Sequence, residues 1–206
     1  MRVIAGSAGG VRLAVPRRGV RPTMDRVKAA IFSSLGDAIL GARVLDLFAG
    51  TGALGIEALS RGAASVVFVE DDRQSADLIE KNLAKTKLKG RVRNQDVFDF
   101  LRHASNADKF EIIFADPPYE KTKHSESHTG KLLNNKSLPQ LLEPQGIFVF
   151  EKRPSETVAE KQLWRVIRQK TYGATEVLFL SHSAIRDAQS ATPTVSREHA
   201  KNFGVA

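Results

Sequence analysis

Four residues suited to chemistry on an amine follow an apolar run at residues 110–115. The run predicts a buried strand, and Asp116, Pro117, Pro118 and Tyr119 come directly after it. The exocyclic amine of a nucleobase is a weak nucleophile because its lone pair is conjugated with the ring. Asp116 and the Pro117 carbonyl can each accept a hydrogen bond from such an amine, and Tyr119 can stack on the base. Unless the tetrad is only a proline-stiffened turn, it predicts methyl transfer to an amine.

A methyl donor is expected over residues 44–55, a predicted strand that runs into a glycine turn and a helix starting near Ala53. Glycines in such a turn let backbone amides approach a ligand closely. The predicted donor-binding residues of this segment are Asp46, Phe48, Ala49, Gly50 and Gly52. The same glycine spacing, followed by Glu70, also fits a dinucleotide fingerprint or plain tight packing. Because a nicotinamide enzyme has no use for the later tetrad, the methyl donor is favoured.

Acidic residues follow the second predicted strand, Ser65 to Glu70. Glu70 and its neighbour Asp71 can hold ribose hydroxyl groups, which either cofactor carries. The alternative is a solvated acidic turn in which Asp72 caps the next helix. Glu70 and Asp71 are therefore predicted to bind the donor.

Several of these motifs together resemble the bacterial 16S ribosomal RNA guanine-N2 methyltransferases. The resemblance rests on the tetrad, on residues 45–59 (LDLFAGTGALGIEAL), on residues 61–63 (RGA) and on residues 21–27 (RPTMDRV), and it spans about Met1 to Leu180. It implies S-adenosylmethionine as donor, a Rossmann-like sheet, and methylation of one guanine in small-subunit RNA. It also implies donor contacts for Thr23 and Arg26, and for Asp96 and Val97 beside the adenine, although Asp96 equally fits a helix cap.

A net charge of +8 favours a polyanionic partner. The cations at the amino terminus predict an RNA-facing patch, whose members are Arg2, Arg12, Arg17, Arg18 and Arg21. Residues 1–20 are expected to form a β-hairpin extension, because both flanks of a glycine-rich stretch alternate like strands. A second basic run between Lys81 and Arg93 is interpreted as a solvated helix end and loop. Residues 121–131 are interpreted as a polar loop that can act as a lid, and its two histidines as loop residues rather than metal ligands.

Alternating strand and helix patterns predict an α/β fold with a mostly parallel, seven-stranded, doubly wound sheet that ends in an antiparallel strand. One methyltransferase domain is expected over residues 1–181, followed by a disordered polar tail over 182–206. The chain has no cysteine, so it has no disulfide and no thiolate metal site. Without an apolar run near the ~20 residues of a membrane span or a signal-peptide pattern, we expect a cytoplasmic monomer without a metal.

Two rival functions share these motifs. A DNA adenine-N6 or cytosine-N4 methyltransferase has the same tetrad, but reading duplex sequence takes a recognition domain for which this chain has no room. A non-catalytic RNA-binding protein on the same fold is the second rival. The predicted substrate is accordingly 16S ribosomal RNA or a small-subunit assembly particle.

Overall fold

The computed structural model describes residues 1–15, 24–105, 107–118, 127–156 and 163–183. A seven-stranded sheet with the strand order β3-β2-β1-β4-β5-β7-β6 forms the centre of the molecule. Its strands are β1 (Arg43–Leu47), β2 (Ser65–Glu70), β3 (Arg91–Asn94), β4 (Phe110–Ala115), β5 (Leu142–Lys152), β6 (Trp164–Tyr172) and β7 (Thr175–His182). The first five strands are parallel, and β7 lies antiparallel to both β5 and β6. The mostly parallel sheet and the antiparallel carboxyl-terminal pairing are thus confirmed.

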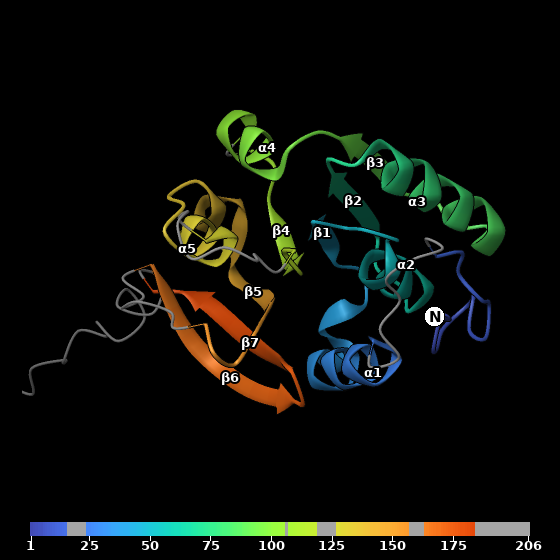
Figure 1. Cartoon of the computed structure of the whole chain (residues 1–206), viewed down its shortest axis with the longest axis horizontal. Coiled ribbons are helices and arrows are strands. Elements are labelled where there is room, and N and C mark those ends of the chain that lie inside the picture. Colours follow the sequence, from blue (N-terminus) through green and yellow to red (C-terminus); the bar gives the residue numbers. More distant parts are fainter. Residues whose placement is uncertain (16–23, 106, 119–126, 157–162, 184–206) are drawn as a thin grey trace, which may run out of the picture.

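Helices cover both faces of the sheet, as the alternating pattern requires (Figure 1). The helices α1 (Met24–Leu35), α2 (Ala53–Ser60) and α3 (Arg73–Thr86) pack in one hydrophobic cluster with side chains such as Phe68 and Phe114. The helices α4 (Val97–His103) and α5 (His128–Leu133) and the 3-10 helix η2 (Leu138–Leu141) pack in another with Phe148 and Phe150. A short 3-10 helix, η1 (Gly36–Ile39), follows α1. The central strands β1, β2 and β4 are buried on both faces, so they carry the nearly continuous apolar runs that the sequence shows, whereas the edge strands β3 and β6 are mostly exposed.

Asp72 and Asp96 form the helix caps that the sequence allowed. Asp72 accepts a hydrogen bond from the Ser75 amide at 2.8 Å, which begins α3, and Asp96 accepts from the Asp99 amide at 2.9 Å, which begins α4. Each satisfies a backbone donor that the first helical turn leaves without a partner. Trp164 is buried, and its indole donates to the Leu133 carbonyl.

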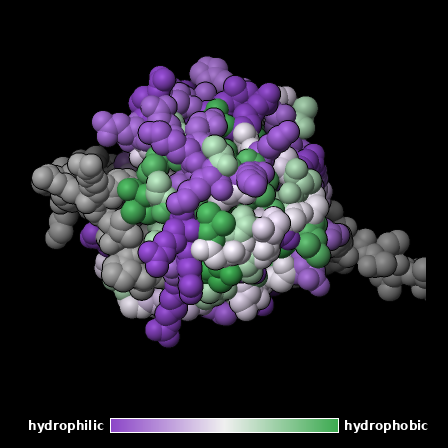
Figure 2. Space-filling model, turned by 90° about the vertical axis from the view of Figure 1, so that its right-hand side faces the viewer, coloured by the Kyte–Doolittle hydropathy of each residue, from purple (hydrophilic) through white to green (hydrophobic). Residues whose placement is uncertain are grey.

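The amino-terminal hairpin is not confirmed. Instead of two paired strands, this segment forms one isolated antiparallel bridge between Arg2 and Arg12. Backbone amides that a strand ladder would use are bound by side chains of α2: the Ile4 and Ala5 amides donate to Glu57, and the Ala8 amide donates to Ser60. The segment is consequently docked on α2, on the face seen in Figure 2.

Gly6 permits this docking, because its backbone lies against the carboxyl-terminal end of α2. A Cβ atom at Gly6 would lie 1.8 Å from the Ser60 carbonyl oxygen, whereas Gly10, with the same φ of +85°, has no atom within 4 Å of such a Cβ. We expect Gly6→Ala to displace the segment and to abolish hydrogen-exchange protection of the Ile4 and Ala5 amides. Gly10→Ala is the matched control and carries only the left-handed backbone penalty of about 1–2 kcal/mol. Equal protection in the two variants would contradict the docking.

The interpretation of residues 128–131 as loop was wrong. Ser127 accepts from the Gly130 amide and caps α5, and Thr129, Leu132 and Leu133 of that helix are buried. Tyr119 and residues 120–126 lie outside the described residues, as do Arg17, Arg18, Arg21, Thr23 and the tail from 184 onward. Within the described part of the chain, no helix is long and apolar enough to cross a membrane.

Candidate active site

The carboxyl ends of β1, β2 and β4 meet at one edge of the sheet and surround a cavity of about 390 Å³. This volume falls within the about 300–1,000 Å³ typical of small-molecule sites. Parallel strands that diverge at a change of strand order leave such a crevice at their carboxyl ends, and here β1 lies between β2 and β4. Predicted residues that line the cavity are Asp46, Phe48, Ala49, Gly50, Glu70, Asp71, Asp96, Asp116 and Pro118.

Left-handed backbone conformations shape the turn after β1. Phe48, Gly50 and Gly52 have φ values of +55°, +55° and +74°, a region that costs a residue with a side chain about 1–2 kcal/mol. A Cβ atom at Gly50 would have only the Phe48 carbonyl oxygen near it, at 4.0 Å, so it would project into the cavity. At Gly52 a Cβ atom would instead meet Ile79 at 3.1 Å. Gly50 keeps space for a ligand, and Gly52 lets the turn pack on α3.

Glu70 holds the glycine turn in place. Its carboxylate accepts from the Gly50 amide at 2.7 Å and from the Asp72 amide at 3.0 Å, one bond to each oxygen. Burial raises the pKa of Glu70, and the two amides oppose this rise. Each carboxylate oxygen retains a lone pair for a further donor. Glu70 thus lies at the cavity wall with capacity for a hydroxyl group.

Asp46 is a second buried carboxyl group in the wall. It accepts from the Gly55 amide at 2.9 Å, across the turn from β1 to α2. Burial raises its pKa to about 8 from the ordinary 3.8, the Gly55 bond opposes the rise, and the charges of Asp116 and Glu70 add to it. Three carboxyl groups therefore share this edge of the sheet, and Asp46 binds a proton over much of the neutral range.

The raised pKa of Asp46 predicts a pH-dependent stability. Between pH 3.8 and about 8 the folded protein retains a proton on Asp46 that the unfolded chain has lost, so the free energy of unfolding falls as the pH rises. Asp46→Asn keeps the acceptor for Gly55 and removes the titration. We expect its free energy of unfolding relative to wild type to increase from pH 4 to pH 8, by up to about 1.4 kcal/mol per pH unit. Urea unfolding across this range measures it, and parallel curves would contradict it.

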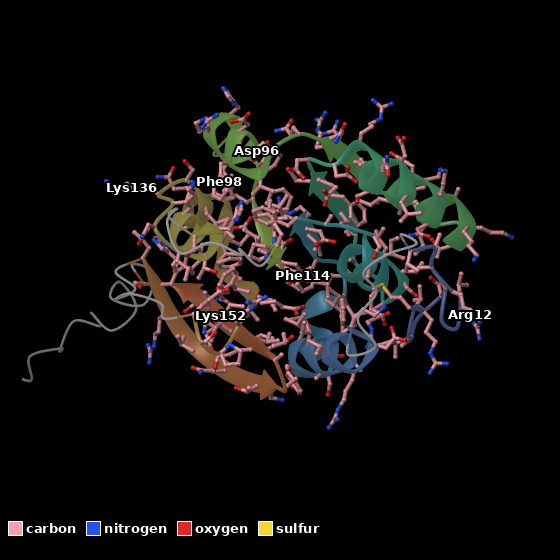
Figure 3. All side chains as sticks on the ribbon, viewed as in Figure 1. Arg12, Asp96, Phe98, Phe114, Lys136 and Lys152 are labelled. Atoms are coloured by element: carbon pink, nitrogen blue, oxygen red, sulfur yellow. The ribbon has the colours of Figure 1, made fainter. Side chains whose placement is uncertain are left out.

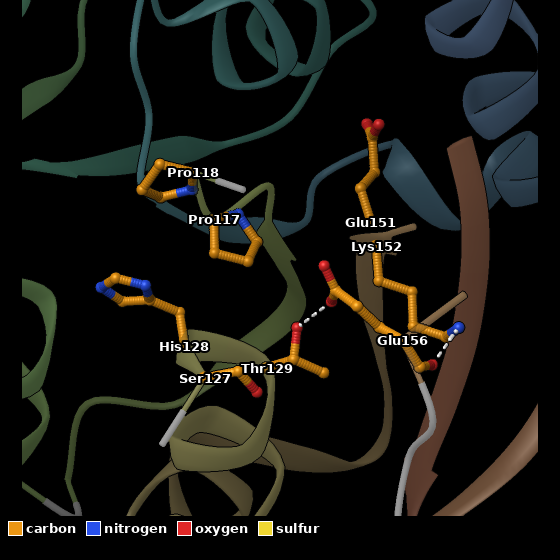
Figure 4. Close-up of a pocket in the computed structure, with 8 residues that line it drawn as sticks. All are labelled: Pro117, Pro118, Ser127, His128, Thr129, Glu151, Lys152 and Glu156. Atoms are coloured by element: carbon orange, nitrogen blue, oxygen red, sulfur yellow. Dashed lines mark hydrogen bonds between the residues drawn. The ribbon is translucent and has the colours of Figure 1, made fainter. Parts of the chain in front are cut away.

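Pro118 also lines a smaller pocket of about 20 Å³, which has room for a water molecule but not for a base. Pro117 and Pro118 face His128 across it (Figure 4). On its other side Thr129 donates to Glu156 at 2.6 Å, which ties the chain after β5 to α5. Lys152 supports the same segment by donating to the Glu156 carbonyl at 2.8 Å. The rigid backbone of the tetrad thus lies against α5.

Sequence reasoning missed His128, as it missed six other residues that line the large cavity: Met1, Val15, Thr51, Ala53, Leu54 and Ser75. His128 borders both pockets and packs edge-on against Phe48 at 5.7 Å and stacked on Phe98 at 5.9 Å between ring centroids. The available signal was Ser127, whose side chain suits a helix cap, followed by the apolar pair Leu132 and Leu133. That pattern predicts a helix that starts at His128. From that helix start, His128 could have been placed at the edge of the sheet where the cavity lies.

Three further residues were predicted to contact the donor, namely Arg26, Val97 and Asp96. Arg26 is exposed on α1, and Val97, the first residue of α4, is buried; neither lines the cavity, and their donor contacts stay predictions. Asp96 lies at the start of α4 (Figure 3) and borders the cavity while it caps that helix. Among the described residues, no group of three or more His, Cys, Asp or Glu side chains is placed to hold a metal ion.

Comparisons with known proteins agree with this geometry. The family described as Conserved hypothetical protein 95 matches residues 1–181. Ribosomal RNA small subunit methyltransferase D of Haemophilus influenzae is 35% identical over 177 residues, which cover 84% of this chain and 89% of the relative. The structure of a hypothetical protein of Thermus thermophilus superposes with a TM-score of 0.73 at 30% identity, covering 88% of this chain and 99% of the other.

A more distant structure holds ligands. The Thermus thermophilus 16S rRNA N2 G1207 methyltransferase, solved with AdoMet and guanosine, has a TM-score of 0.59 at 26% identity and covers 81% of this chain and 44% of that protein. The match over residues 1–181 and the relative that is similar over most of its length place the chain in the Conserved hypothetical protein 95 family, as a relative of the small-subunit ribosomal RNA methyltransferases D.

Proposed function

We propose that the protein transfers a methyl group from S-adenosylmethionine to the exocyclic N2 amine of a guanine in 16S ribosomal RNA. One observation carries the proposal: Asp116 and Pro118, at the end of β4, border the same cavity as the glycine turn after β1. Amine acceptors and a donor site therefore lie side by side. The names of the relatives support RNA of the small subunit as the substrate.

The cavity suits S-adenosylmethionine in volume and in the groups around it. Gly50 leaves its space open, Glu70 and Asp71 offer acceptors for ribose hydroxyl groups, and Asp96 offers one for the adenine amine. When bound, the donor supplies a methyl group on a sulfonium centre that a nucleophilic nitrogen can attack. The apolar Phe48, Ala53 and Leu54 complete the lining with surface on which a planar base can pack.

Asp116 and the Pro117 carbonyl act on the target amine. Two acceptors on one nitrogen draw its hydrogen atoms out of the base plane, which frees the lone pair for attack. Asp116 need not remove a proton first, because a carboxylate is far too weak a base to deprotonate a neutral amine. Once methylated, the nitrogen is strongly acidic and its proton leaves readily. Tyr119, which we propose stacks on the base, lies outside the described residues.

The target guanine must leave its stack to reach Asp116. An amine inside an RNA helix is covered by its neighbours, so enzymes that modify a base turn it out into a pocket. The small pocket beside Pro117 cannot hold a base as it stands. We therefore propose that the base reaches Asp116 from the side of the larger cavity, where Pro118 and His128 form the boundary between the two spaces.

A comparison of RNA and DNA as methyl acceptors tests the proposed function. Methyl transfer from labelled S-adenosylmethionine should occur to small-subunit RNA that lacks its own modification, and not to duplex DNA. Transfer to DNA would overturn the choice of RNA. Binding of the donor without transfer to RNA or to small-subunit particles would favour a non-catalytic RNA-binding protein instead. We propose that the protein acts in the cytoplasm as a monomer. Sedimentation of the active protein checks its oligomeric state.

A further inference from the structure

A dense group of cations lies away from the predicted amino-terminal patch. Residues 81–93 contain six basic side chains and no acidic one. All six are exposed, and no ion pair between described residues involves any of them. They are Lys81, Lys85, Lys87, Lys89, Arg91 and Arg93, which we call the α3–β3 surface.

The α3–β3 surface concentrates charges of one sign. Lys81 and Lys85 are four residues apart on α3, where like charges repel by about 0.2–0.5 kcal/mol, and the position of Lys85 in the last turn of the helix offsets that repulsion. The cations continue past the end of α3 to β3, which is the edge strand of the sheet. A solvated helix end needs no such run of one sign, because alternating charges would keep it soluble without repulsion. The run therefore points to an anionic partner.

The α3–β3 surface is continuous with the amino-terminal segment. The side chain of Asn82, which is fully buried, accepts from the Ala14 amide at 2.7 Å and donates to the Ala14 carbonyl at 3.0 Å. Asn82 lies between Lys81 and Lys85 on α3. The same amide group donates to the Thr51 carbonyl at 3.0 Å, on a turn that lines the large cavity. One side chain thus fixes the amino-terminal segment beside the cations and beside the cavity.

Figure 2 shows this side of the molecule. Hydrophilic side chains gather most densely on its upper part, at the height of α3 and β3 in Figure 1. Arg2 and Arg12 are exposed on the docked amino-terminal segment of the same face. Asn82 thus joins the segment that carries Arg2 and Arg12 to α3, whereas Arg91 and Arg93 lie with the amino ends of the strands, at the edge of the sheet away from the cavity.

We propose that the α3–β3 surface binds the phosphate backbone of the RNA substrate outside the target nucleotide. This inference rests on the proposed function and extends it. Backbone contacts fix the position of a nucleic acid without reading its sequence, which suits an enzyme whose large RNA substrate extends beyond the cavity that receives one base. Lysine and arginine on phosphate release bound counterions, so the contacts make affinity depend on salt.

Salt titration of the variant Lys81→Gln/Lys85→Gln/Lys89→Gln tests the surface. Glutamine has nearly the helix propensity of lysine, so α3 should persist. Each lost phosphate contact reduces the slope of log affinity against log salt by about 0.7–0.9. We expect affinity for protein-free 16S RNA to fall on the order of 100-fold at 0.15 M salt, a loss that follows from three contacts at that slope. Affinity for S-adenosylmethionine should not change.

A matched control removes three exposed cations from the other side of the molecule. The control is Lys136→Gln/Arg165→Gln/Lys170→Gln, with Arg165 and Lys170 on β6, the opposite edge of the sheet. Figure 3 places Lys136 on the side opposite Arg12. The control has the same net charge as the test variant and should retain wild-type affinity and slope.

The outcomes separate this inference from the proposed function. Equal losses of RNA affinity in the test and control variants would mean a general charge effect and would overturn the proposed role of the α3–β3 surface. The proposal would also be wrong if the test variant kept the wild-type salt dependence of RNA affinity while the wild-type protein methylates RNA. A wild-type protein that neither binds nor methylates 16S RNA or small-subunit particles would overturn both proposals. The three single variants, each with a slope reduced by about 0.7–0.9, apply the same test if the triple variant is unstable.

Discussion

Asp116→Ala is expected to lose turnover while it retains donor binding. The variant removes the charged acceptor from the target amine, and removal of one electrostatic group from such a site costs about 10²–10³ in kcat. The cavity wall contributed by Gly50, Glu70 and Asp96 is unchanged, so the dissociation constant for S-adenosylmethionine should stay within about threefold. Single-turnover methyl transfer and calorimetry measure the two quantities separately.

The structure also predicts the stability of this variant. The charge of Asp116 contributes to the raised pKa of Asp46, because the two carboxyl groups share the edge of the sheet. Removing Asp116 relieves that repulsion, so the free energy of unfolding of the variant should fall less between pH 4 and pH 8 than that of wild type. Asp108→Ala, at an exposed loop position, is the control and should keep full activity. Retained turnover in Asp116→Ala would refute its assigned role.

Glu57→Ala is expected to produce the largest loss of stability. Glu57 is fully buried and binds Lys28 at 3.0 Å and Arg61 at 2.7 Å, in addition to the Ile4 and Ala5 amides. Its removal leaves the Lys28 ammonium buried without its carboxylate partner, and breaking a buried pair in this way costs about 3–5 kcal/mol. Denaturant unfolding measures the loss, and the amino-terminal segment should lose protection from proteolysis.

Two comparisons test the cause of that loss. Glu80→Ala removes an exposed glutamate from α3 and should change the free energy of unfolding by less than about 0.5 kcal/mol. In Lys28→Met/Glu57→Ala no buried cation is left over, so the double variant should be destabilised by less than the sum of the single variants. Additive losses would show that the pair is not coupled.

The interactions of Glu57 also make the free energy of unfolding depend on pH. Burial opposes the charge, but the Ile4 amide, Lys28 and Arg61 together hold the pKa of Glu57 below its ordinary value. A lowered folded pKa stabilises the protein above the unfolded value of about 4.3 and loses that contribution as the pH falls below it. The Glu57 and Asp46 contributions therefore have opposite dependence on pH, and Asp46 dominates above pH 5.

Much of the sheet was predictable because its signals are local. Apolar runs such as residues 110–115 mark strands buried on both faces, and the turn after Leu47 needs glycine at positions with positive φ. Parallel strands with helical crossovers then bring the residues after β1, β2 and β4 to one edge. The cavity was thus predictable from strand ends alone, once Asp46, Glu70 and Asp116 had been placed there.

What the sequence did not reveal depends on contacts between distant residues. The amino-terminal segment alternates like a hairpin, yet Glu57 and Ser60 bind its amides from more than fifty positions away, and this competition is invisible to local pattern. Asn82 likewise looks like an ordinary surface residue of an amphipathic helix, although it bridges Ala14 and Thr51.

The most direct test of the central claim is nucleoside analysis of the methylated product. Labelled methyl should be transferred from S-adenosylmethionine to small-subunit RNA that lacks its endogenous modification, and the RNA should then be digested to nucleosides. We predict N2-methylguanosine as the labelled product, and at least about 100-fold less of it from Asp116→Ala in the same time. Labelled N6-methyladenosine would contradict the assignment of guanine, and an absence of label with RNA and with small-subunit particles would contradict the proposed reaction.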